Sequence, residues 1–192
     1  MAITVPDRWS QALAKAPTTG ASARTAQQDH LPPGVDSSHK MAEADLARVL
    51  QIADVLRAVG AAVDVPAAVI AGLASRESRC GAVLDPKGFG DQGNAFGILQ
   101  VDKRFHRLLG VDEGPRSRAH LEQAVGILVA FRDQMQTRHA DWEDEFILKG
   151  AAVAYNSGVG NVQTKAGMDQ GTTGDDYGSD VIARAQFYAR HI

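Results

Sequence analysis

The clearest pattern in this chain is a series of apolar residues spaced three and four positions apart. After Glu43 they are Leu46, Val49, Leu50, Ala53, Leu56 and Val59, and Gly60 supplies a C-terminal stop. A second helix is expected from Val65, with Asp64 as its N-cap and Pro66 in its first turn. This second helix has almost no polar face as far as Ala74, which indicates a helix buried at the centre of a domain.

The chain changes character between Gly81 and Asp102, where glycines are frequent and residues 94–101 could form short strands of a hairpin or small sheet. Further helices are expected over 121–135, from Asp141 toward Tyr155, and over about 180–190. A loop rich in Gly and Thr, residues 156–178, separates the last two. The pattern predicts a mostly helical α+β domain with one small antiparallel sheet.

The N-terminal part has little apolar periodicity and is rich in Ala, Thr, Gln, Ser and Pro up to residue 40. We expect an extended or partly ordered segment over residues 1–33 and a folded domain over 34–192. Residues 1–10 include Asp7 and Arg8 and have no apolar core, so no secretory signal is expected there. No stretch approaches the ~20 apolar residues of a membrane span, so no membrane association is expected.

The composition of the chain argues against nucleic-acid binding, disulfide bonds and metal sites. With 192 residues, 44% of them apolar, the chain can bury one core, and its net charge of −3 provides no basic field for nucleic acid. Cys80 is the single cysteine, so no intrachain disulfide can form; a nucleophilic role would need a histidine base beside it, and a plain small apolar residue is the simpler reading. Histidine spacing and the 85–94 loop do not match metal-ligand patterns, so neither a metal nor a cofactor is expected.

Glu77 is the candidate catalytic residue, because it ends the apolar helix and precedes a loop rich in Gly and Asp. Apolar surroundings disfavour the charged carboxylate and raise its pKa, so the group can hold a proton near neutral pH. Inverting cleavage of a glycosidic bond also needs a carboxylate that activates water, ~6.5–9.5 Å from the acid. Asp91 and Asp102 bracket the hairpin and could supply it; the alternative is that Asp91 caps a turn and Asp102 ends a strand.

Several segments, taken together, closely resemble the goose-type lysozymes. They are Ser75–Arg79, Gly90–Asp91, Asn94–Arg104 and Ala154–Val162, followed in the family's order by Thr172–Tyr177 and Asp180–Gln186. The resemblance extends from about Thr18 to His191, and it is nearest to the cysteine-poor, signal-less form found in fish. Bird members carry two disulfides; the matching positions here are Ala23, Pro33 and the region of Val63 and Asp64, where no cysteine stands.

This resemblance implies a lysozyme-like single domain that hydrolyses the β-1,4 bond between N-acetylmuramic acid and N-acetylglucosamine in bacterial peptidoglycan, with inversion. Glu77 then matches the general acid, and Asp91 and Asp102 match the two aspartates that position or activate water. The residues that match the sugar cleft are His106, Tyr155, Asn156 and Tyr177. Taken without the resemblance, these four would be read as core-edge aromatics, a helix end and a surface loop residue.

The resemblance also sets expectations about partners and surroundings. Expected partners are peptidoglycan, N-acetylglucosamine oligosaccharides and a bacterial proteinaceous lysozyme inhibitor, for a monomeric protein in antibacterial defence. The family implies an extracellular protein; without a signal, a cytoplasmic or unconventionally released form is expected instead. Two alternatives stay open: a lytic transglycosylase, which leaves 1,6-anhydro products and needs no aspartate partner, and a non-catalytic peptidoglycan-binding protein.

Overall fold

A computed structural model describes residues 7–192. Residues 1–6, which belong to the stretch tested for a signal and to the expected N-terminal segment, lie outside the described residues. The α-helices are α1 (Arg8–Lys15), α2 (Ala23–Ala26), α3 (Val35–Leu50), α4 (Ala53–Ala62), α5 (Ala67–Ser78), α6 (Arg118–Arg138), α7 (Asp144–Ser157) and α8 (Tyr177–Tyr188). The 3-10 helices are η1 (Gln27–Asp29), η2 (Asp91–Gly93), η3 (Val159–Asn161) and η4 (Thr173–Asp175), and the strands are β1 (Phe89–Gly90), β2 (Ala95–Phe96) and β3 (Val101–Asp102).

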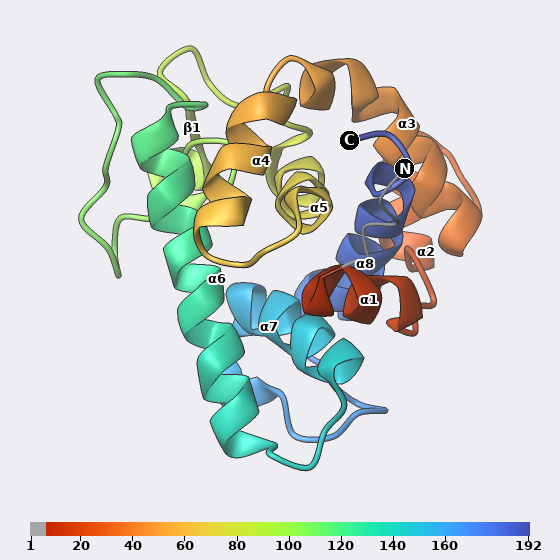
Figure 1. Ribbon diagram of the computed structural model, residues 1–192. Coiled ribbons are helices and arrows are strands. Elements are labelled where there is room, and N and C mark those ends of the chain that lie inside the picture. Colours follow the sequence, from red (N-terminus) through yellow and green to blue (C-terminus); the bar gives the residue numbers. More distant parts are fainter. Residues whose placement is uncertain (1–6) are drawn as a thin grey trace, which may run out of the picture.

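Helix α5 is the central element of the fold. Every residue from Ala68 to Ser75 is buried, and α3, α4 and α8 pack around the helix (Figure 1). Gly72 allows the closest of these approaches, because a Cβ there would lie 2.8 Å from the carbonyl oxygen of Val181 and 3.0 Å from the Cβ of Ala185 in α8. The buried central helix predicted from the apolar pattern is therefore confirmed.

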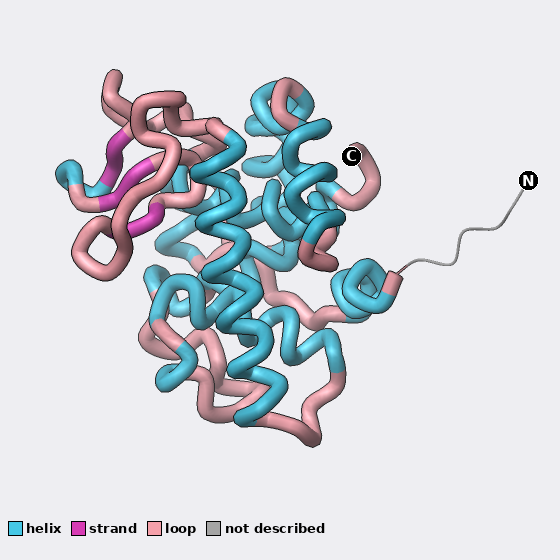
Figure 2. Tube along the Cα trace, turned by 60° about the vertical axis from the view of Figure 1, so that its left-hand side comes forward, coloured by secondary structure: helices cyan, strands magenta, loops and turns pink. Residues whose placement is uncertain are grey.

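The three short strands form one antiparallel sheet in the order β1-β2-β3, with Phe89 opposite Phe96 and Ala95 opposite Asp102. Figure 2 shows the strands gathered at one end of the molecule, beside long loops, with most of the helices lying away from them. The prediction of a mostly helical α+β fold with a small sheet is confirmed.

The single helix expected from Glu43 to Val59 is wrong, because the chain breaks at Gln51 and Ile52 between α3 and α4. Ile52 has φ −119° and ψ 7°, outside the helical region. The spacing of apolar residues continues through the break, so periodicity alone does not reveal it. Nor does Gly60 end the helix; it packs against the backbone of Val65, where a Cβ would lie 2.3 Å from the carbonyl oxygen.

The start of α5 also differs from the expectation. Asp64 adopts φ +55° and does not cap the helix; Pro66 occupies the N-cap position instead. No single helix of residues 7–192 is long and apolar enough to cross a membrane, and α4 and α5 reach that length only as a pair bent by 120°. Most of α5 is buried inside the protein.

The segment between residues 8 and 40 is more helical than its composition indicated. Helix α1 is capped by Asp7, whose carboxylate accepts a hydrogen bond of 2.8 Å from the amide of Ser10. One face of α1 buries Trp9 and Leu13 in the main core, and α3 already begins at Val35. Because alanine supplies most of the other buried positions here, the apolar signal in the sequence is weak.

Candidate functional site

The candidate site is a cleft of about 810 Å³ between the sheet and the C-terminal ends of α5 and α7. Its lining includes most of the residues singled out from the sequence: Glu77, Asp91, Asp102, His106, Tyr155 and Asn156. The other lining residues are Ala95, Gln100, Val101, Arg104, Phe105, Ile127, Phe131, Ala154, Ser157, Gly158 and Thr173. Tyr177 is buried behind Glu77 and does not line the cleft.

Glu77 lies in the last turn of α5, where its side chain is largely buried but reaches the cleft. Burial raises the pKa of its carboxyl from 4.5 to about 7, although a hydrogen bond from Tyr177 and the charge of Arg76 act in the opposite direction. The Tyr177 hydroxyl donates that hydrogen bond to Oε1. A substantial fraction of Glu77 is therefore protonated near neutral pH, as a general acid requires.

Arg76 adjoins Glu77 but directs its guanidinium to two buried aspartates. It forms ion pairs of 3.0 Å with Asp176 and 2.7 Å with Asp180, and its side chain is 8% exposed. Arg184 contacts the same oxygen of Asp180 at 2.9 Å. Because these carboxylates compensate the charge of Arg76, the arginine lowers the pKa of Glu77 less than burial raises it.

A third buried carboxylate, that of Asp45, fixes the helix on both sides of Glu77. Asp45 of α3 accepts hydrogen bonds from the hydroxyl of Ser75, at 2.7 Å, and from the guanidinium of Arg79, at 2.9 and 3.0 Å. Arg79 also binds Asp29, and it ends α5 in the left-handed conformation, φ +54°. The end of α5 is thus held from α3 and from the N-terminal segment.

Asp91 and Asp102 lie at two edges of the sheet region, Asp91 at the start of η2 and Asp102 at the end of β3. The guanidinium of Arg104 contacts both, at 3.2 Å from Asp91 and 2.5 Å from Asp102. Hydrogen bonds from Arg104 hold the pKa of Asp102 below its usual value. The cleft therefore has a protonatable group at Glu77 and an ionised carboxylate at Asp102.

The polar residues expected in the sugar cleft have different surroundings. The Tyr155 hydroxyl donates to the carbonyl oxygen of Leu99 at 2.8 Å, and burial together with the charge of Glu77 raises the pKa of that phenol well above 10. Asn156 and Thr173 are joined by two hydrogen bonds of 3.0 and 3.2 Å. His106 is exposed, and its imidazole has no hydrogen-bond partner in the described part of the chain.

Arg104 and Thr173 are contact residues that sequence reasoning missed. Arg104 lies in the turn that follows β3, two residues after Asp102, and the sequence pattern does not show that its side chain turns back to that carboxylate. Nor does the pattern give a signal for Thr173, which meets Asn156 only through the folding of the 156–178 loop.

The described residues offer little support for a metal site, a cysteine nucleophile or a second catalytic cleft. Within residues 7–192, no group of three or more His, Cys, Asp or Glu side chains could hold a metal ion. Cys80 is buried and unpaired, and burial raises the pKa of its thiol to about 12, which argues against a nucleophilic thiolate. A second cavity of about 740 Å³ lies between α1, the start of α5 and the C-terminus, and it holds no comparable carboxylate pair.

Comparison with known proteins places this arrangement in a family. The family model described as Lysozyme g matches residues 12–192. The chain is 44% identical to "Lysozyme g" of Gallus gallus over 175 residues, which are 91% of this chain and 81% of that protein, and 45% identical to "Lysozyme g" of Cyprinus carpio over 91% and 92%. It is also 45% identical to a "Glycine, glutamate and proline-rich protein" of Lottia gigantea, over 87% of this chain and 41% of that protein. The chain therefore belongs to the lysozyme g family and is a glycoside hydrolase.

Proposed function

We propose that this protein is a muramidase that hydrolyses the β-1,4 bond between N-acetylmuramic acid and N-acetylglucosamine in bacterial peptidoglycan. Membership of the lysozyme g family supports the substrate class. The observation that carries the proposal is Glu77: a carboxyl group at the end of a buried helix, facing the cleft, with a pKa raised to about 7.

In the proposed mechanism, protonated Glu77 donates its proton to the glycosidic oxygen as the bond to the sugar breaks. A water molecule attacks the anomeric carbon from the opposite face, positioned or activated by Asp91 and Asp102, and the configuration inverts. The lowered pKa of Asp102 supports assigning the proton donor to Glu77 and the water to an aspartate. A carboxylate that binds the attacking water must be ionised while Glu77 still carries its proton.

The other site residues have supporting roles in this proposal. His106, Tyr155 and Asn156 line the cleft and present imidazole, aromatic and amide groups to sugar hydroxyl and N-acetyl groups. Tyr177, which is buried, acts on the substrate only through its hydrogen bond to Glu77. All these residues belong to the proposed catalytic domain, residues 34–192; residues 8–33 support it through contacts such as Asp29 with Arg79.

We extend the proposal to antibacterial defence by a monomer that acts on peptidoglycan and N-acetylglucosamine oligosaccharides and is a target for bacterial proteinaceous inhibitors. Family membership is the support for these points. The two aspartates on the cleft favour hydrolysis over the transglycosylase route, which forms its anhydro ring from the substrate itself.

The test is digestion of purified peptidoglycan with mass analysis of the fragments. Hydrolysis gives reducing muramic acid ends, whereas 1,6-anhydro ends, 18 Da lighter by one water, would reveal a transglycosylase. Glu77→Gln should abolish cleavage and retain oligosaccharide binding, and NMR of fresh product should show the inverted anomer. Binding without any cleavage by the wild-type protein would favour the non-catalytic alternative.

A further inference from the structure

The side chain of Arg104 bridges the two aspartates of the cleft. Its Nη2 lies 3.2 Å from Oδ2 of Asp91 and 2.5 Å from Oδ2 of Asp102. We propose that Arg104 is a positioning residue, which holds Asp91 and Asp102 in the arrangement that the water-binding step needs. This inference rests on the proposed function, since it concerns the carboxylates assigned there to water.

The contact with Asp102 fixes that carboxylate completely. Nε of Arg104 lies 3.0 Å from Oδ1 and 2.9 Å from Oδ2, and the backbone amide of Arg104 donates to Oδ1 at 2.7 Å. Both oxygens therefore have donors, and the plane of the carboxylate cannot rotate without breaking several hydrogen bonds. The accompanying decrease in the pKa of Asp102 keeps it ionised over a wider range of pH.

The contact with Asp91 is different, because it uses one oxygen only. Oδ1 of Asp91 has no hydrogen-bond partner among residues 7–192, which makes it the open acceptor of the pair. Asp91 is 55% exposed and has φ +46°, in the short η2 turn. Arg104 is the only side chain that the described structure places on this carboxylate, so it sets the distance between Asp91 and Asp102.

A merely structural role explains these contacts poorly. The side chains of Arg104 and Asp91 are each 55% exposed, and exposed ion pairs contribute little to the stability of a fold. Placement of a catalytic group is far more sensitive, since an error of about 1 Å can reduce a rate about 100-fold. Loss of Arg104 should therefore affect turnover much more than folding.

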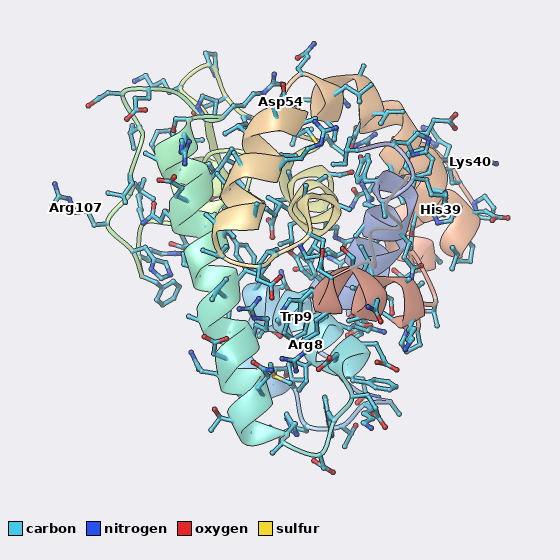
Figure 3. All side chains as sticks on the ribbon, viewed as in Figure 1. Arg8, Trp9, His39, Lys40, Asp54 and Arg107 are labelled. Carbon is cyan, nitrogen blue, oxygen red and sulfur yellow. The ribbon has the colours of Figure 1, made fainter. Side chains whose placement is uncertain are left out.

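Arg107 is a matched control in the same loop. It is exposed, its guanidinium has no partner within the described residues, and Figure 3 shows it pointing away from the body of the molecule. Replacing it removes the same charge from the same neighbourhood without touching either aspartate.

The experiment compares Arg104→Gln, Arg104→Lys and Arg107→Gln with the wild-type protein in kcat and KM on N-acetylglucosamine oligosaccharides between about pH 2.5 and 8, a range that includes the acid limb expected from the lowered pKa of Asp102. Arg104→Gln should lower kcat roughly 10- to 100-fold, with KM changed less than about threefold. As the pH is lowered, the activity of Arg104→Gln should begin to fall at a higher pH than that of the wild-type protein, because Asp102 loses the partner that lowers its pKa. Arg104→Lys should be intermediate, since an ammonium keeps the charge but not the planar fork, and Arg107→Gln should match wild type.

Two results would overturn the proposal. One is an Arg104→Gln variant with wild-type kcat and an unmoved acid limb. The other is a large loss of melting temperature in both Arg104 variants, which would assign the residue to folding. The proposed function is tested separately by Asp91→Asn combined with Asp102→Asn: full activity in that double variant would remove the aspartates from the mechanism, whatever the Arg104 variants show.

Discussion

The hydroxyl of Tyr177 donates a hydrogen bond to Oε1 of Glu77, from a side chain that is itself 2% exposed. This bond favours the ionised form of Glu77, whereas burial favours the protonated form and has the larger effect. Burial is the main reason why the pKa of Tyr177 is raised, and the charge of Glu77 and the hydrogen bond to it act in the same direction. Tyr177 therefore adjusts the pKa of the proposed acid without entering the cleft.

Removing the Tyr177 hydroxyl should shift the pH dependence of activity upward. In Tyr177→Phe the pKa of Glu77 rises further, because a hydrogen bond that stabilises the carboxylate is lost. The basic limb of the kcat profile should move up by roughly one pH unit, the equivalent of about 1.4 kcal/mol, while activity at pH 5 changes little. Kinetics from pH 4 to 9 measure this; a basic limb that stays in place or moves down would contradict it.

Glu77 should also make the fold less stable as pH rises. A carboxyl whose pKa moves from 4.5 in the unfolded chain to about 7 in the folded one contributes stability below pH 4.5 and loses it as the pH rises to 7. Glu77→Gln, which cannot ionise, should therefore be more stable than wild type at pH 8, by up to about 3 kcal/mol. The difference should fade by pH 4. Urea unfolding at both pH values tests it, and a constant difference would count against a raised pKa.

The buried ion pairs next to the site should be essential for folding. Asp180 is fully buried and contacts both Arg76 and Arg184, so Asp180→Asn leaves two buried guanidinium groups short of charge compensation. We expect a loss of about 3–5 kcal/mol. The control is Asp54→Asn, which breaks an exposed ion pair with Arg57 and should leave the unfolding midpoint nearly unchanged. Asp54 is labelled in Figure 3. Equal effects in the two variants would refute this assignment.

Two glycine-to-alanine substitutions should change the stability of the fold in opposite directions. Gly72→Ala places a Cβ 2.8 Å from the backbone oxygen of Val181 and should destabilise the fold by about 1–3 kcal/mol. Gly126→Ala on α6 meets no atom within 4 Å and should stabilise it by about 0.5–1 kcal/mol, since alanine favours the helix. Thermal melting of both variants provides the comparison; a neutral Gly72→Ala would mean that α5 and α8 can separate easily.

The parts of the fold that sequence reasoning recovered are those with a local signal. The buried helix that carries Glu77 in its last turn was readable because its residues up to Ala74 are apolar on all sides, and the short sheet was readable from its glycines. The break at Ile52 was not, because the apolar spacing is the same on both sides of it. Helix α1 was also missed, since one aromatic and one leucine among alanines give little periodicity.

The residues of the candidate site also fall into those that the sequence indicated and those that only the fold reveals. The candidate acid and the two candidate aspartates were singled out from their types and positions, but the partners of Glu77 and its neighbour Arg76 come from distant parts of the chain. Tyr177 lies 100 residues from Glu77, and Asp180 lies 104 residues from Arg76. Pairings at such separations depend on how the helices pack, which a single sequence does not encode in any local pattern.

The most direct test of the account is titration of the Glu77 carboxyl itself. The carboxyl carbon of Glu77, identified by its loss from the ¹³C NMR spectrum of Glu77→Gln, should titrate with a pKa of about 7 in the wild-type protein. A pKa near the ordinary 4.5 would mean that Glu77 is ionised at neutral pH and cannot hold the proton that bond cleavage requires.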